Sequence, residues 1–149
     1  SFFFPRSGET ACFVSNHRGV DVIERDFHPP ARMRVILTSN IPYRAGEDDL
    51  FVVYDQYTND DEMISDNAGL MLLKLLIRCG AKEVFLAGFD GFLPSAKGNY
   101  FRQELDIPLK EEEALEKQRR IRKQLKELSR FLNLTFLTPS VYEQEEADV

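Results

Sequence analysis

Residues 65–92, SDNAGLMLLKLLIRCGAKEVFLAGFDGF, contain a helix and the strand that follows it. The side-chain oxygens of Ser65-Asp66-Asn67 can accept hydrogen bonds from the free N–H groups of a first helical turn, so we expect the helix to begin there. It should end at Cys79-Gly80. Residues 70–77 are apolar almost all the way round the helix, which indicates that other elements cover it on both sides.

A short apolar run, Val84–Ala87, comes after the helix and stops at Gly88–Gly91. Its length and composition predict a buried parallel strand. Runs of the same kind recur elsewhere, and each predicts a further strand. They are Ala11–Val14, Val35–Leu37, Leu50–Tyr54 and Thr135–Leu137. We therefore predict an α/β fold, a three-layer α/β/α domain with a mainly parallel, Rossmann-like sheet.

Every one of these runs ends in small polar or charged residues. The carboxyl ends of strands in an open parallel sheet line a crevice in which ligands bind. Alternatively, these residues only form turns, which are commonly polar. The candidate ligand-binding residues are Asn16, His17, Arg18, Ser39, Asn40, Asp55, Asp66, Asn67, Asp90 and Ser140. We expect Asn16, Ser39, Asp55, Asp66, Asn67, Asp90 and Ser140 to line one continuous pocket.

A long connection, residues 91–110, leaves the end of the Asp90 strand. Connections of this length are usually functional lids or disordered segments. Asn99, Tyr100 and Arg102 can close over the crevice as a lid, with Tyr suited to an aromatic face and Arg to an anion. An exposed loop without function is the alternative.

Length and composition indicate a single domain spanning residues 1–149, with flexible ends at 1–10 and 143–149. Of the residues, 43% are hydrophobic and 30% are charged, which is ordinary for a soluble globular protein. The first residues, SFFFPRSGET, lack both an initiating Met and the pattern of a signal peptide. We therefore expect a piece of a longer chain, in the cytoplasm and without a membrane span.

A net charge of −6 argues against nucleic acid as a partner. The locally basic run Lys117–Lys123 lies in a helix expected over Lys110–Phe131, whose first turns carry Glu111, Glu112, Glu113 and Glu116. This order complements the helix dipole and offers ion pairs between residues four apart. A solvated, salt-bridged face is the favoured interpretation, and a patch for nucleic acid or lipid is the alternative.

Cys12 and Cys79 should be buried thiols in a reducing compartment, since neither has a partner at metal-ligand spacing. The two histidines, His17 and His28, form no metal-binding motif, and no glycine-rich phosphate loop is present. We therefore predict no metal site and no cofactor. The helix start Asp66–Gly69 offers N–H groups that can hold an anion.

The chain resembles known protein families in the unit DNAGLMLLKLLIRCGAKEVFLAGFDGF, in the NYF that follows it, and in FVSNHRG, VILTSN and FLTPS. It resembles the carboxy-terminal domain of pyruvate-dependent, hydroxymethylglutaryl-CoA-lyase-like aldolases from bacterial surface-polysaccharide gene clusters. The match covers most of Ala11–Ser140. More distantly, the pattern is similar to bacterial sialyltransferases that use a CMP-activated sugar.

The aldolase resemblance implies a companion domain, because the chain has neither a His-x-His pair nor the length of a (β/α)8 barrel. It implies a small polar ligand, sugar- or nucleotide-like, and an N-terminal catalytic domain in the same parent chain as partners. The parent is then a lyase, while the isolated domain cleaves no aldol. Two alternatives stay open: a sialyltransferase-like enzyme with His17 as base, and a structural module that forms homo-oligomers.

Overall fold

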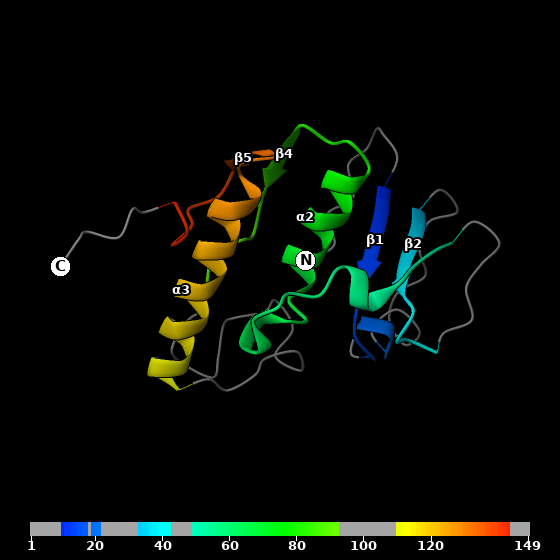
Figure 1. Ribbon diagram of the computed structural model, residues 1–149, viewed down its shortest axis with the longest axis horizontal. Helices are drawn as coiled ribbons and strands as arrows, with labels where there is room; N and C mark the ends of the chain where they lie inside the picture. Colours follow the sequence, from blue (N-terminus) through cyan, green and yellow to red (C-terminus); the bar gives the residue numbers. More distant parts are fainter. Residues whose placement is uncertain (1–9, 18, 22–32, 43–48, 93–109, 144–149) are drawn as a thin grey trace.

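The computed structural model describes residues 10–17, 19–21, 33–42, 49–92 and 110–143 (Figure 1). Strands and helices alternate along these residues, which confirms the mixed α/β class. In chain order the elements are β1 (Thr10–Val14), β2 (Met33–Thr38), β3 (Leu50–Val52), the short 3-10 turns η1 (Tyr54–Gln56) and η2 (Glu62–Ile64), α2 (Ala68–Arg78), β4 (Glu83–Leu86), α3 (Glu111–Leu128) and β5 (Asn133–Phe136).

The strands pair in parallel, as predicted. One sheet has the order β1-β2-β3, with Cys12 opposite Val35 and Leu37 opposite Phe51. The other consists of β4 and β5, with Val84 opposite Leu134. We expected one sheet, whereas the described residues form these two. Figure 1 shows α2 between β1 and the β4–β5 pair, so side-chain packing on this helix connects the two sheets.

The start and end of α2 agree with the prediction. Asn67 has an extended backbone, and its side-chain oxygen Oδ1 accepts a hydrogen bond from the N–H of Leu70 at 3.0 Å. This bond satisfies one of the N–H groups that a helix's first turn leaves without a partner. The helix ends at Cys79, whose backbone N–H donates to the carbonyl of Leu75 at 2.9 Å.

The apolar circumference of α2 is covered on two sides, as the sequence predicts. On one side Leu70 and Leu73 pack with Ile121 and Leu125 of α3, against β4 and β5. On the other side the hydrophobic packing is against the first sheet and η1, and it involves Met71, Leu75 and Tyr57 together with Phe13, Ile36, Val52, Tyr54 and Leu72. A single helix therefore contributes to two hydrophobic clusters.

The opposite face of β1 and β2 is also covered. Its buried side chains, Cys12, Val14, Val35 and Leu37, pack with Val20 and Ile41. Val20 lies in a helical stretch just after β1. Since α2 lies on one face of this sheet and Val20 on the other, the first sheet has packed layers on both sides, as in Rossmann-like α/β proteins.

The prediction that Val84–Ala87 is a buried strand is wrong in one respect. Side chains of β4 and β5 alternate between exposed and half-buried. One face packs on α2 and α3, while the other leaves Phe85 57% exposed and, just after β5, Leu137 63% exposed. Nothing in the described part of the chain covers this second face, so the strand has the burial of a one-sided sheet.

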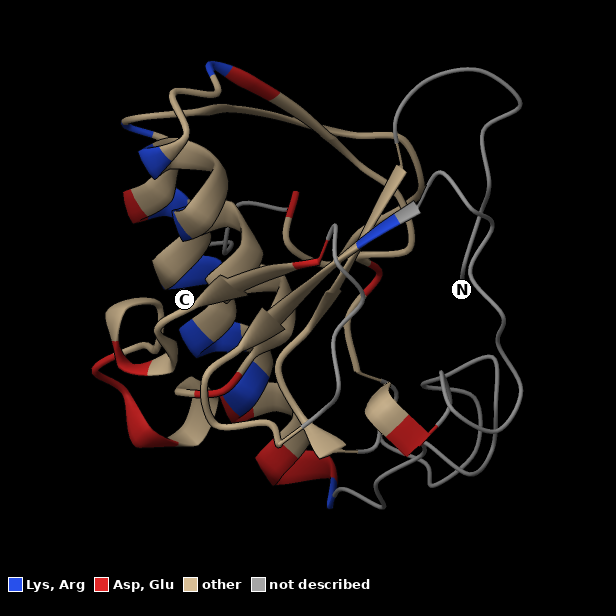
Figure 2. Cartoon of the chain, turned by 90° about the vertical axis from the view of Figure 1, so that its right-hand side faces the viewer, with Lys and Arg blue, Asp and Glu red and all other residues tan. Residues whose placement is uncertain are grey.

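Helix α3 carries the predicted ion pairs. Glu113 pairs with Lys117 at 3.5 Å and Glu116 with Arg120 at 2.6 Å. Hydrogen bonds from Arg119 and Arg120 lower the pKa of Glu116 to about 2. Figure 2 shows the basic residues along α3 and acidic residues at its start. These pairs favour the interpretation of a solvated, salt-bridged face. Separately, none of the helices in the described part of the chain has the length and apolar composition that a membrane span requires.

The two cysteines lie in different environments, and the prediction that both are buried is wrong for Cys79. Cys12 is 8% exposed in β1, and burial raises its pKa to about 11. Cys79 is exposed because it caps α2 at the point where the chain leaves the helix. Only the thiolate is the nucleophile, so Cys12 should be far less reactive.

We expect iodoacetamide at pH 8 to alkylate Cys79 in the native protein and to reach Cys12 only after unfolding. Mass spectrometry of proteolytic fragments measures the labelling of each thiol. In Cys79→Ser the native protein should take up label at the slow rate of Cys12. Equal labelling of both thiols without denaturant would contradict the buried position of Cys12.

Candidate functional site

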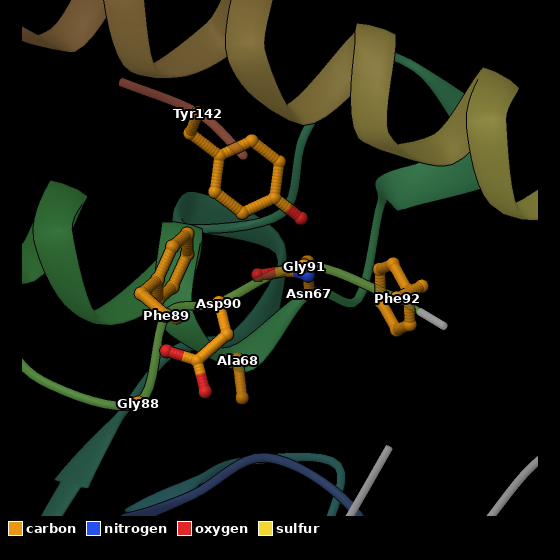
Figure 3. Close-up of a pocket in the computed structure, with 9 residues that line it drawn as sticks. Asn67, Ala68, Gly88, Phe89, Asp90, Gly91, Phe92 and Tyr142 are labelled. Carbon is orange, nitrogen blue, oxygen red and sulfur yellow. The ribbon is translucent and has the colours of Figure 1, made fainter. Parts of the chain in front are cut away.

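A pocket of about 240 Å³ lies where the start of α2 meets the carboxyl ends of β4 and β5. Figure 3 shows the aromatic rings and the Asp90 carboxylate that surround it. Three chain segments build its wall: the beginning of α2, the turn after β4 and the turn after β5. The lining residues are Asn67, Ala68, Gly69, Gly88, Phe89, Asp90, Gly91, Phe92 and Tyr142.

The α2 segment brings a helix N-terminus to the pocket. The N–H groups of Ala68 and Gly69 have no carbonyl acceptor within the helix, because they belong to its first turn. The side-chain oxygen of Asn67 is already engaged by the N–H of Leu70. Asn67 is therefore a structural cap that also forms part of the wall.

Phe89 lies directly against this first turn. A Cβ atom on Gly69 would lie 2.4 Å from Cε2 of Phe89, so the ring approaches the helix as closely as a glycine permits. On its other side Phe89 contacts Tyr142, with ring centroids 5.4 Å apart and an angle of 57° between the rings. This tilted pair is a favourable aromatic geometry and gives the pocket an apolar wall.

The Asp90 carboxylate is held in place by a residue of the turn after β5. The hydroxyl of Thr138 donates to Oδ1 of Asp90 at 2.9 Å, and the N–H of Gly88 donates to the same hydroxyl oxygen at 2.9 Å. The backbone carbonyl of Asp90 accepts from the N–H of Val141 at 3.1 Å. Asp90 is nevertheless exposed, and of the described residues that line the pocket it is the one with a charged side chain.

Ser140 lies behind the lining and joins the same two turns. Its hydroxyl donates to the carbonyl of Phe89 at 2.6 Å and accepts from the N–H of Tyr142 at 3.2 Å. Only 9% of Ser140 is exposed. We predicted Ser140 as a ligand-binding residue, and the structure gives its hydroxyl a role in positioning the aromatic residues on either side.

Of the predicted site residues, the structure brings Asn67 and Asp90 together in this pocket. Asp66 is exposed just before α2. The candidates that follow β1, β2 and β3 lie at the carboxyl ends of their strands, as predicted, but this pocket does not extend to them. These are Asn16, His17, Ser39, Asn40 and Asp55. Arg18, Asn99, Tyr100 and Arg102 lie outside the described residues.

Several polar side chains at the ends of the first sheet stabilise its turns. The Asn16 side chain accepts from the N–H of Gly19 at 2.9 Å. The Ser39 hydroxyl oxygen accepts from the N–H of Tyr54 at 3.1 Å, and the Asn40 amide donates to the carbonyl of Ser15 at 3.3 Å. The Asn16 contact lies within one turn, as the alternative predicts. The other two join the ends of neighbouring strands, so they too serve the structure of this edge.

Sequence reasoning missed the aromatic part of the site. Phe89 and Phe92 flank Asp90 and Gly91 in the turn after β4, and that pattern was a usable signal. Tyr142 had none, because its place depends on the turn after β5 folding back toward β4. No group of three or more potential metal ligands is found among the described residues.

The geometry of the pocket is therefore the basis for a functional assignment. Comparison of the chain with protein-family models, with curated proteins and with solved structures found no match.

Proposed function

We propose that this domain binds a small polar ligand, sugar- or nucleotide-like, in the pocket between α2 and the ends of β4 and β5. The observation that carries the proposal is the exposed Asp90 carboxylate, fixed by Thr138 beside the aromatic residues Phe89 and Tyr142. Small-molecule sites combine apolar walls with a few polar groups held in position. An accessory role beside a catalytic domain is what the expected resemblance to aldolase companion domains implies.

The hydrogen bonding within the site supports this assignment. Hydrogen bonds between the two turns fix Asp90, Phe89 and Tyr142 before any ligand arrives. A ligand that meets groups already in place loses less free energy to the ordering of side chains. The pocket is thus suited to binding without a large rearrangement.

A thermal-shift screen against nucleotides, sugars and nucleotide sugars tests the proposal. A ligand at 100 times its dissociation constant adds about 2.7 kcal/mol of stability, which corresponds to a Tm increase of about 5–10 °C in a domain of this size. Asp90→Asn should keep the acceptor for Thr138 and leave the Tm of the free protein nearly unchanged. It should weaken binding by about 1.5–3 kcal/mol, the value of a hydrogen bond to a charged group.

Glu83→Gln is the matched control, because it removes the same charge from an exposed position at the opposite end of β4. Its ligand affinity should equal that of the unaltered protein. Unaltered affinity in Asp90→Asn would assign Asp90 to the turn alone. A sialyltransferase-like enzyme would instead consume a CMP-activated sugar, and a purely structural module would respond to no compound in the screen.

A further inference from the structure

We infer that the pocket selects one neutral sugar ring and disfavours phosphorylated sugars and nucleotides. This inference rests on the proposed function and narrows its ligand class. Three features of the described pocket carry it: its size, the sign of its charge and the placement of its aromatic rings.

Size comes first. The pocket holds about 240 Å³. Sites for drug-sized ligands usually hold roughly 300–1,000 Å³. A complete nucleotide sugar, with a base, two sugar rings and phosphates, exceeds this space, whereas a single sugar ring does not. The described walls therefore fit one ring.

The charge of the pocket disfavours anionic ligands. Among the described residues, the lining includes a carboxylate, Asp90, and no Lys, Arg or His. A phosphate placed beside Asp90 meets a like charge, and no cation in the described part of the lining compensates for it. The N-terminus of α2 does attract anions, but its dipole is equivalent to about half an elementary charge. A carboxylate carries a full charge, so repulsion outweighs this attraction at equal distance.

The aromatic residues supply the third feature. A sugar ring presents C–H groups on its faces and hydroxyl groups at its edge. Phe89, Tyr142 and Phe92 give the pocket apolar surface for a face, as Figure 3 shows. Asp90 accepts hydroxyl hydrogens from the edge, and Thr138 fixes the position of the carboxylate. An ionised carboxylate has acceptor sites for more than one donor.

Isothermal titration of the whole chain with D-glucose, D-galactose, D-mannose and N-acetyl-D-glucosamine, and with their 6-phosphates at matched ionic strength, tests the inference. At least one neutral sugar should bind about tenfold or more tightly than its phosphate. Asp90→Asn should weaken binding of the neutral sugar. It should also reduce the affinity ratio of the neutral sugar to its phosphate, because it removes the repelling charge. Glu83→Gln should preserve the ratio.

Different results would overturn the inference alone or the inference together with the proposed function. If a phosphorylated sugar binds as tightly as its neutral form, or if only nucleotides and nucleotide sugars bind, the inference is overturned while the proposed binding function stands. If the affinity ratio of the neutral sugar to its phosphate is the same in Asp90→Asn as in the unaltered protein, Asp90 is not the selecting group. The inference is then again overturned. Absence of binding by every sugar, nucleotide and nucleotide sugar overturns both.

Discussion

Replacing Leu73 with Ala should lower the free energy of unfolding by about 2–5 kcal/mol, the range for large-to-small substitutions in a packed core. Leu73 is 2% exposed and lies in the cluster that α2 and α3 share, with Ile121, Leu125 and Leu128. The substitution removes apolar contacts and leaves a cavity that the two helices cannot fully close. Guanidinium unfolding, with the m value fitted for each protein, measures the loss.

Leu115→Ala is the matched control. Leu115 is on α3 and is 59% exposed, so the same chemical change should alter stability by less than about 0.5 kcal/mol. Equal losses in the two variants would contradict the packing of α2 against α3. A reduced m value in Leu73→Ala alone would indicate a change in the two-state transition as well as in stability.

Gly91→Ala should have the second large effect, because it combines backbone strain with crowding. The φ angle of Gly91 is 114°, a conformation that residues with a Cβ rarely adopt. Such strain costs about 1–3 kcal/mol. The new Cβ would also lie 2.6 Å from Cγ2 of Val141, and overpacking of this kind costs a further 1–3 kcal/mol or so. Because Gly91 lines the pocket, ligand affinity should fall too.

Gly80→Ala separates the two causes in the same unfolding assay. The φ angle of Gly80 is 85°, but a Cβ there would meet nothing within 4 Å. This variant should therefore lose only the strain contribution and keep its ligand affinity. If Gly80→Ala and Gly91→Ala lose the same free energy of unfolding, the contact of the new Cβ with Val141 adds no measurable cost.

Much of the fold could be predicted because its determinants are local. The Asn67 cap and the apolar run after it are adjacent in sequence, and they predicted both the limits of α2 and its burial on two sides. The exposure of Phe85 could not be predicted in this way. An apolar run does not show whether another layer covers its second face, since that depends on elements distant in the chain.

The site could be predicted only in part for the same reason. The position of Asp90 after a parallel strand indicated a pocket residue, and Asp90 does line the pocket. The role of Thr138 as its hydrogen-bond partner depends on the register of β4 against β5, which no local pattern specifies. The same register places Tyr142 against Phe89.

The hydrogen bonds between the turns after β4 and β5 have a consequence for the order of synthesis. Asp90 and Thr138 are 48 residues apart, and Phe89 and Ser140 are 51 residues apart. A ribosome-bound chain that ends within α3 can already contain α2 and β4, yet it lacks the partners that orient Asp90 and Phe89. If the pocket binds the proposed ligand, capture therefore requires a chain in which β5 has already paired with β4, and occupancy of the pocket would report that this pairing has formed.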